Sequence, residues 1–325
     1  METLSKKIAK LILQNPIVDL LMVPFVFVSV VVLKIARSIG IAKLPISRRV
    51  MVSVGIMPIR DHYYEPLFNK KHLIKPLSDD RTLPGIAWNV EEQLSILNSF
   101  HYNGEFQNIG TQYSNDLTFH FNNNAFESGD AEYWYNIIRL KKPKRIIEIG
   151  SGNSTRLARL AIENNKKESA DYRCEHICIE PFEAPWLEKL GIKIIRDRVE
   201  NVDKMLFQSL GSGDILFIDS SHMIRPQGDV LFEYLELLPI LNKGVIVHIH
   251  DIFSPKDYPE SWIFEEAKFW NEQYLLEAFL TSNNDWKIIG AVNFLHHNHY
   301  EKLKGKCPRL TPEREPGSFY MEKLV

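Results

Sequence analysis

From Ala131 onward, short apolar runs alternate with segments in which apolar residues recur at helical spacing. The apolar runs predict five strands: Arg145–Gly150, Glu175–Pro181, Ile192–Asp197, Asp214–Ser220 and Val245–Asp251. The periodic segments predict four helices: Ala131–Leu140, Asn153–Asn164, Gly228–Leu241 and Trp262–Leu280. Two further strands are expected over Trp286–Phe294 and Ser318–Lys323. This alternation predicts an α/β fold with a mostly parallel sheet that helices cover on both faces.

The N-terminal region has a different pattern. Ile17–Leu33 reads IVDLLMVPFVFVSVVVL, which is short for a membrane-spanning helix of about 20 residues but within reach if Ile35 and Ala36 join it. Basic residues flank the run on both sides: Lys6, Lys7 and Lys10 before it, and Lys34, Arg37, Lys43, Arg48 and Arg49 after it. No small-x-small cleavage site follows, which disfavours a secretory signal peptide.

Asp19 and Pro24 favour another arrangement, in which the helix is buried against the protein or lies in the bilayer surface, because a carboxylate in hydrocarbon is costly. We expect membrane association through residues 17–36, with both arrangements open. If the helix spans, the larger positive charge after it places the following domain in the cytoplasm. We therefore expect a membrane-associating segment at 1–43, an extension or cap at 44–130, and the α/β domain at 131–325. Within the extension, only Val90–Phe100 has a clear helical pattern.

Charge and cysteine content exclude some classes of protein. Lys and Arg number 39 against 41 Asp and Glu, so a nucleic-acid partner bound through a basic surface is not expected. Three cysteines cannot form a disulfide framework. Cys174 and Cys178 are spaced C-x3-C, but no second ligand pair follows at zinc spacing, so we expect them to be packing residues.

A glycine turn follows the first predicted strand of the α/β domain. Residues 148–155 read Glu-Ile-Gly-Ser-Gly-Asn-Ser-Thr, and the glycines Gly150 and Gly152 would let a ligand approach the backbone at a helix N-terminus. A nicotinamide-binding turn would have a third glycine where this chain has Thr155. The second strand ends in Glu180, a carboxylate able to hold both ribose hydroxyls of a nucleoside.

Polar residues also end the fourth and fifth strands, which would face each other across a cleft if the strands are neighbours. Asp219 and His222 follow one strand, and His248, His250 and Asp251 end the other. A histidine at such a position is a natural general base near neutral pH, and the carboxylates could hold a divalent cation. One of the two histidines on the fifth strand is expected to be structural. A further run, His296-His297-x-His299, is expected in a polar surface loop.

These motifs resemble those of the class I S-adenosylmethionine (SAM)-dependent methyltransferases, over roughly Ala131 to Lys323. The resemblance implies a Rossmann-like, seven-stranded sheet and a reversed last hairpin. It implies that the turn cradles the methionine part of SAM, that Glu180 binds the ribose, and that Asp197 or Arg198 lies near the adenine. The cofactor-binding set is then Glu148, Gly150, Ser151, Gly152, Ser154, Thr155, Glu180, Asp197 and Asp219.

Within the family, FIDSSH most resembles sugar and macrolide O-methyltransferases and cephalosporin-hydroxylase-like proteins. Metal-dependent relatives place an Asp at the end of strand four and an acidic pair at the end of strand five. Here Asp219 and Asp251 match, but His250 replaces one acid. Because magnesium prefers oxygen ligands, a site of Asp219, His250 and Asp251 leaves magnesium, manganese and no metal all open.

The sequence thus predicts SAM-dependent O-methylation of a glycan, lipid-linked sugar or polyketide-like acceptor. His222 is the expected base, and Asp219 and Asp251 organise the acceptor. The alternatives are an NAD-dependent oxidoreductase on a similar sheet and a non-catalytic nucleoside-binding module. Neither the acceptor nor the oligomeric state follows from the sequence.

Overall fold

The computed structural model describes residues 15–182 and 184–325, and the chain divides into two compact units after Leu73. This division falls inside the region expected to form the extension. Lys6, Lys7 and Lys10, which flank the apolar run, lie outside the described residues.

The first unit contains one long apolar helix, α2 (Pro16–Ile39), followed by η1 (Ile41–Lys43), α3 (Pro45–Val54) and η2 (Lys70–His72). The side chain of Asn15 accepts a hydrogen bond from the Ile17 amide at 2.9 Å and caps α2. By length and composition alone, α2 could cross a membrane, although a signal sequence near an N-terminus meets the same description. Its most apolar stretch is not buried.

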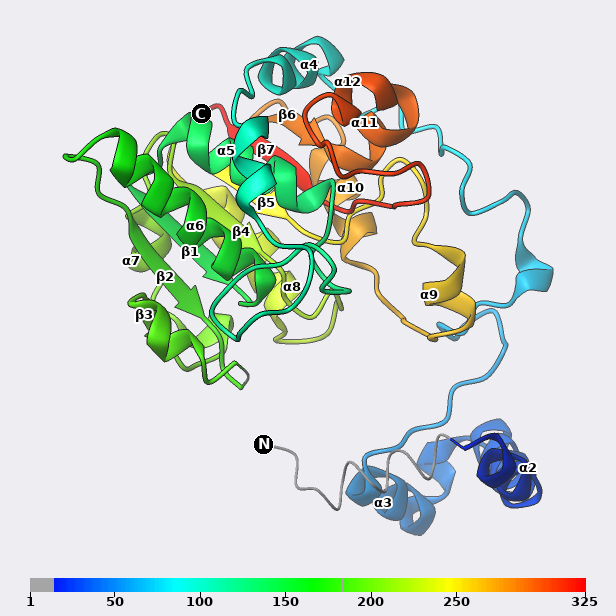
Figure 1. Ribbon diagram of the computed structural model, residues 1–325. Coiled ribbons are helices and arrows are strands. Elements are labelled where there is room, and N and C mark those ends of the chain that lie inside the picture. Colours follow the sequence, from blue (N-terminus) through cyan, green and yellow to red (C-terminus); the bar gives the residue numbers. More distant parts are fainter. Residues whose placement is uncertain (1–14, 183) are drawn as a thin grey trace. The chain divides into compact units, whose positions relative to one another are not determined.

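The second unit is built on a seven-stranded sheet of order β3-β2-β1-β4-β5-β7-β6 (Figure 1). The first five strands along the chain run parallel, and β7 is antiparallel to both β5 and β6. The bounds are Arg145–Ile149 (β1), Glu175–Ile179 (β2), Lys193–Ile195 (β3), Ile215–Ile218 (β4), Ile246–Ile249 (β5), Trp286–Ala291 (β6) and Phe319–Lys323 (β7). The predicted Rossmann-like sheet and its reversed last hairpin are confirmed.

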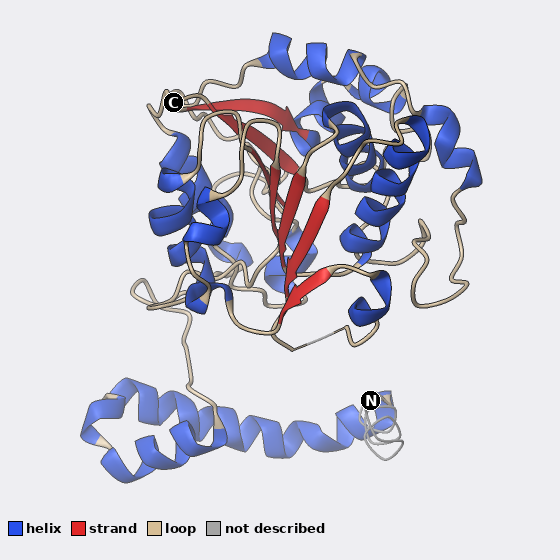
Figure 2. Ribbon diagram, turned by 90° about the vertical axis from the view of Figure 1, so that its left-hand side faces the viewer, coloured by secondary structure: helices blue, strands red, loops and turns tan. Residues whose placement is uncertain are grey.

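Helices cover both faces of this sheet (Figure 2). The longer helices of the unit are α4 (Val90–Asn98), α5 (Asp130–Lys141), α6 (Asn153–Glu168), α10 (Glu272–Leu280) and α11 (Val292–Asn298). Shorter helical segments connect them: η3 (Asn103–Asn108), η4 (Leu187–Leu190), η5 (Val199–Asn201), α7 (Met205–Gln208), α8 (Asp229–Phe232), η6 (Glu233–Leu237), η7 (Leu238–Ile240), α9 (Glu260–Phe264) and α12 (Tyr300–Lys304).

The core has two layers because successive residues of a strand point to opposite faces. Ile146 of β1 packs with residues of α5 and α6, whereas the next residue, Ile147, packs with residues of η6 and α10. Both isoleucines are fully buried. A parallel sheet buried in this way explains why its strands are almost continuously apolar.

Two expected elements are wrong in detail. The single helix expected over Trp262–Leu280 is two helices, α9 and α10, and residues 265–271 connect them. In that connection Ala267 has a left-handed φ of 52°, and the amide of Asn271 donates to the carbonyl of His222 at 3.0 Å. The strand expected to reach Phe294 ends at Ala291, after which the chain turns into α11.

The histidine run was also expected in a surface loop, and this is wrong. His296 and His297 lie in α11, and His299 follows its last residue. His296 is buried and contacts the carbonyl of Pro312 at 3.3 Å. These contacts bind the helix to the segment before β7.

Candidate active site

The glycine turn after β1 passes very close to the end of β4. Gly150 has a left-handed φ of 79°, and a Cβ atom there would lie 2.0 Å from the carbonyl oxygen of Asp219. The amide of Asp219 in turn donates to the carbonyl of Ile149 at 2.9 Å. Only glycine fits at position 150, because any side chain would collide with backbone and strain the dihedral.

The turn is held from below by a short hydrogen-bond chain. The amide of Gly152 donates to the Thr155 hydroxyl at 3.1 Å, and that hydroxyl donates to Oε2 of Glu148 at 2.5 Å. Glu148 and Thr155 are completely buried. Ser154 is also buried, and its carbonyl accepts from the Trp134 indole at 3.2 Å. These side chains shape the turn from beneath, so any effect on a bound cofactor is indirect.

A cavity of about 340 Å³ opens at the carboxyl ends of β1, β2 and β4. Three residues of the expected cofactor set line it together: Gly150, Glu180 and Asp219. The Glu180 side chain is nearly buried, and its Oε1 accepts from the amide of Phe182 at 3.0 Å. The remaining lining is mixed: Ile149, Ile179, Pro181, Phe182, Arg198, Val199, Glu200, Ser220, Ser221, Arg225 and Asp229.

Asp197 does not line this cavity. Its exposed carboxylate accepts from the amide of Arg198 at 2.7 Å and from the side chain of Asn201 at 2.8 Å. The hydrogen bonds from Asn201 and from Arg198 lower the pKa of Asp197. From this loop it is Arg198, the other residue that the resemblance implied, that reaches the cavity.

His222 lies at the centre of an acidic cluster beside the cavity. Its Nδ1 is 2.8 Å from Oε2 of Glu272, and its Nε2 faces Oδ1 of Asp219 at 3.2 Å and Oδ2 of Asp251 at 3.5 Å. His222 has a left-handed φ of 57° and is buried, and its ring packs against Trp270 with centroids 4.3 Å apart. The structure thus joins the predicted ends of β4 and β5, and Asp219 belongs to both cavity and cluster.

The electrostatics of the cluster favour charged forms of His222 and Asp219. Burial alone lowers the pKa of His222, but hydrogen bonds with Asp219 and Glu272 dominate and raise that pKa well above its ordinary value. Burial likewise opposes ionisation of Asp219, yet the charges of His250 and His222 hold its pKa below the usual range. Burial raises the pKa of Asp251 against the pull of these histidines.

His248, which lies in β5, and His250, which follows the strand, have different environments. His248 is completely buried, contacts the Ser318 hydroxyl at 2.9 Å and stacks on Tyr320, and burial lowers its pKa well below the ordinary value. His250 instead has its Nδ1 3.6 Å from Asp219 and 3.5 Å from Asp251, and neither of its buried ring nitrogens has a hydrogen-bond partner among the residues that the structure describes. His248 therefore fits the expected structural role.

The cluster fits a divalent cation. The ligand atoms of Asp219, His222 and Asp251 lie within 4.8 Å of one another. Nδ1 of His250 lies 3.6 Å from Oδ1 of Asp219 and 3.5 Å from Oδ1 of Asp251. The expected set of Asp219, His250 and Asp251 is therefore gathered in one place, with His222 added. A nitrogen donor in the set suits manganese better than magnesium.

Sequence reasoning missed Glu272 and Trp270, which complete the surroundings of His222. Both come from the segment expected to be one long helix, where a Glu and a Trp look like ordinary helix residues. Glu272 is fully buried and also accepts from the Tyr234 hydroxyl at 3.1 Å. A buried carboxylate is unusual, but burial cannot be read from this segment's pattern.

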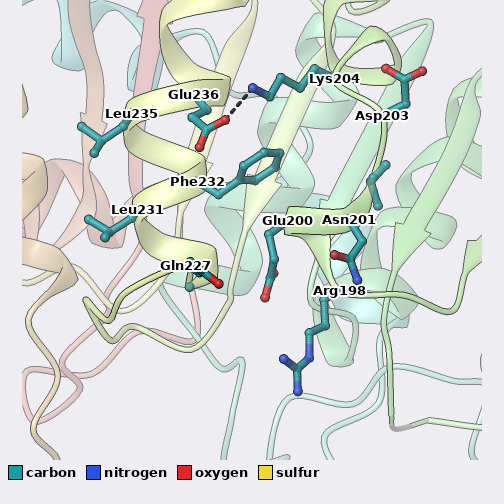
Figure 3. Close-up of a pocket in the computed structure, with 12 residues that line it drawn as sticks. Arg198, Glu200, Asn201, Asp203, Lys204, Gln227, Leu231, Phe232, Leu235 and Glu236 are labelled. Atoms are coloured by element: carbon teal, nitrogen blue, oxygen red, sulfur yellow. Dashed lines mark hydrogen bonds and ion pairs between the residues drawn. The ribbon is translucent and has the colours of Figure 1, made fainter.

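A wider groove of about 880 Å³ adjoins the first cavity and shares Arg198 and Glu200 with it. Figure 3 shows Phe232 on one wall and Lys204 opposite it, with the Lys204–Glu236 ion pair at 2.5 Å across the groove. The groove continues the site along α8 and η6.

The sequence model of a family described as a methyltransferase domain matches residues 147–252, which run from β1 past the end of β5. The chain belongs to the class I SAM-dependent methyltransferases. An uncharacterized protein of Archaeoglobus fulgidus is 32% identical to it over 163 residues, which are 46% of this chain and 72% of that relative. The matched stretch of this methyltransferase carries the glycine turn, Glu180, Asp219, His222 and Asp251.

Solved structures of methyltransferases resemble the fold more distantly. The O-methyltransferase TomG of Streptomyces achromogenes, in complex with SAM, has a TM-score of 0.36 and 12% identity and covers 73% of this chain and 97% of its own. CalS11, a TDP-rhamnose 3'-O-methyltransferase of calicheamicin biosynthesis, has a TM-score of 0.38 and 14% identity and covers 74% and 99%. At these TM-scores the similarity of the structures does not identify the residues of the site.

Proposed function

We propose that this methyltransferase transfers the methyl group of SAM to a hydroxyl oxygen of a small-molecule acceptor at the His222 cluster. The observation that carries the proposal is the position of Asp219, which lines the cofactor cavity and also contacts His222 at 3.2 Å. A cofactor in the cavity and an acceptor at the cluster would therefore be neighbours. Proximity of two aligned reactants supplies a large part of the acceleration of such a transfer.

For the cofactor, we assign the nearly buried Glu180 to the ribose hydroxyls and the Gly150–Gly152 turn to the methionine part. Ser151 belongs to that turn, and Glu148, Ser154 and Thr155 support it from beneath. Arg198 takes the place beside the adenine, because Asp197 lies outside the cavity lining.

We assign Nε2 of His222 as the atom that accepts the proton of the hydroxyl group. Glu272 holds Nδ1, so this nitrogen carries the ring proton and Nε2 is left with a lone pair when the imidazole is neutral. The acceptor O–H proton moves to Nε2 while the oxygen attacks the methyl carbon. The carbon–sulfur bond breaks, its electron pair stays on sulfur, and S-adenosylhomocysteine leaves.

A divalent cation, manganese or magnesium, would be held by Asp219 and Asp251 with a histidine nitrogen. When bound, it would orient the hydroxyl and lower its pKa. Because Nε2 of His222 cannot be both a metal ligand and a free base, we assign the third ligand to His250, whose ring nitrogens are unpartnered.

For the acceptor, we propose a ring-containing molecule such as a glycan, lipid-linked sugar or polyketide-like compound. Trp270 packs on His222, and Trp262 and Trp270 lie edge to face with centroids 5.1 Å apart, which gives the cluster an aromatic wall.

We further propose that residues 17–36 attach the protein to a membrane and that the catalytic domain is cytoplasmic.

The test is a transfer assay with methyl-labelled SAM. Detergent-solubilised protein is incubated with lipid and small-molecule extracts and a panel of glycosides, each with chelator, Mn²⁺ or Mg²⁺. Label in a base-stable ether product that His222→Asn fails to form supports the proposal. Label that appears only in amines or thioethers, or S-adenosylhomocysteine formed equally by the variant, contradicts it.

A further inference from the structure

A second group of potential metal ligands lies beneath the glycine turn, outside the active site. Glu148 on β1 is paired with Cys178 on β2, and His176 lies two residues before that cysteine. Residues two apart in a strand share a face, so all three side chains point to the side of the sheet covered by α5 and α6. Glu148 and Cys178 are completely buried and His176 is nearly so.

The three ligand atoms form a triangle of the size that a tetrahedral metal site requires. Sγ of Cys178 is 3.3 Å from Oε2 of Glu148 and 3.8 Å from Nε2 of His176, and that nitrogen is 3.3 Å from the same carboxylate oxygen. Ordinary zinc bond lengths in a tetrahedron place sulfur about 3.5 Å from a nitrogen or oxygen ligand, and these two about 3.3 Å apart. Each observed edge lies within about 0.3 Å of that geometry.

Hydrogen bonds alone leave this group poorly satisfied. Oε2 of Glu148 receives the Thr155 hydroxyl, and the thiol has a single proton to give. Within the described part of the chain, the other carboxylate oxygen, Oε1, and Nδ1 of His176 are buried without a hydrogen-bond partner. Burying an ionised carboxylate with an oxygen that has no hydrogen-bond partner lowers the stability of the fold. A bound cation would neutralise its charge directly.

We propose that Glu148, His176 and Cys178 bind a zinc ion. Thiolate, imidazole and carboxylate together are a donor set typical of zinc. When the ion binds, the Cys178 S–H bond breaks, its electron pair forms the zinc–sulfur bond, and the proton leaves to solvent.

Such an ion would also stiffen the turn above it. The Thr155 hydroxyl connects Glu148 to the amide of Gly152, so a metal on Glu148 fixes one end of the chain that shapes the turn. The site is independent of the divalent cation proposed at Asp219 and Asp251, whose ligands contain no sulfur.

The test is a cobalt titration of full-length protein, purified in detergent without a histidine tag and stripped of metal. Cobalt bound by a thiolate gives a near-ultraviolet sulfur-to-metal charge-transfer band, which the active-site cluster cannot produce. We expect about one equivalent of cobalt to produce this band, zinc to displace it, and the affinity to fall by more than about 10–100-fold in His176→Gln. Cys178→Ala should abolish the band, and Cys174→Ala and Asp219→Asn should keep it.

Folded wild-type protein that gives no such band overturns the proposal, whatever the variants do. A band that survives in Cys178→Ala overturns it as well, because another thiol then binds the metal. Thermal unfolding provides a second readout. Zinc should raise the midpoint temperature of unfolding of the wild-type protein, and it should raise that of Asp219→Asn by the same amount.

Discussion

Nδ1 of His222 lies 2.8 Å from Oε2 of Glu272, and both side chains are buried. The two residues are fifty positions apart in the chain. In the neutral imidazole this contact favours the proton on Nδ1, and Nε2 faces Asp219 and Asp251. A histidine oriented in this way can take up a proton at one defined atom.

Glu272→Gln should therefore lower the pKa of His222 while leaving the ring in place. The carboxylate is one of the groups that raise this pKa above the ordinary 6.5, and an amide of the same shape removes its charge. The check is an NMR pH titration of the His222 ring in chelator-treated protein. An unchanged midpoint would show that Glu272 does not control the protonation of His222. Glu322→Gln, which alters a residue on β7, serves as the matched control.

His222→Asn should reduce turnover by about 10²–10⁴-fold while the affinity for SAM stays the same. The base must be neutral to accept a proton, and its pKa is raised. Turnover of the metal-free wild type should therefore climb as pH rises past the ordinary histidine range and level off above the raised pKa. Initial rates across pH, together with SAM binding, measure both effects. A variant that keeps the wild-type rate and pH profile would remove His222 from the proton transfer.

Gly150→Ala should destabilise the fold and weaken SAM binding, whereas Gly152→Ala should fold normally. The left-handed φ of 79° alone costs on the order of 1–3 kcal/mol for a residue with a Cβ atom, and the clash with the Asp219 carbonyl adds to that cost. At Gly152 no heavy atom of the described residues beyond the neighbouring backbone lies within 4 Å of an added Cβ. Chemical denaturation of both variants makes the comparison. Equal stabilities would mean that the turn does not approach β4 this closely.

The strand pattern made most of the sheet predictable, because a parallel sheet covered on both faces needs continuous apolar runs such as Ile215–Ile218. The glycine turn and the strand ends then predicted Gly150, Glu180, Asp219 and His222 as neighbours. Polar residues at the ends of parallel strands converge on one edge of the sheet, whatever the loops between them do.

The pattern of apolar and polar residues could not predict contacts between residues that lie far apart in the sequence. Glu272 contacts His222 from the first turn of α10, and the pattern of the segment predicted one long helix with no break before this residue. Glu148 meets Cys178 across two paired strands, so no spacing motif marks the group. Asp197 is exposed after β3 and accepts hydrogen bonds from Arg198 and Asn201, and no strand or helix pattern marks these contacts.

Deletion of residues 1–37 should release the protein from membranes. The deleted stretch contains most of α2, whose apolar side chains are exposed within their own unit. Burying such a surface in lipid is favourable, and the second unit has its own core. Carbonate-washed membrane fractions of cells expressing each form measure the distribution. If the shortened protein still pellets with membranes and gives a normal circular dichroism spectrum, attachment lies elsewhere.

The most direct measurement of the central claim is calorimetric titration with SAM, S-adenosylhomocysteine and NAD of wild type, Glu180→Gln and Asp197→Asn. We predict that the wild type binds the first two ligands and not NAD. Glu180→Gln should weaken SAM binding by about 1.5–3 kcal/mol, because the NH₂ group cannot accept the second ribose hydrogen bond. Asp197→Asn, altered outside the cavity lining, should bind like the wild type. Binding of NAD instead of SAM, or full SAM affinity in Glu180→Gln, would contradict the account.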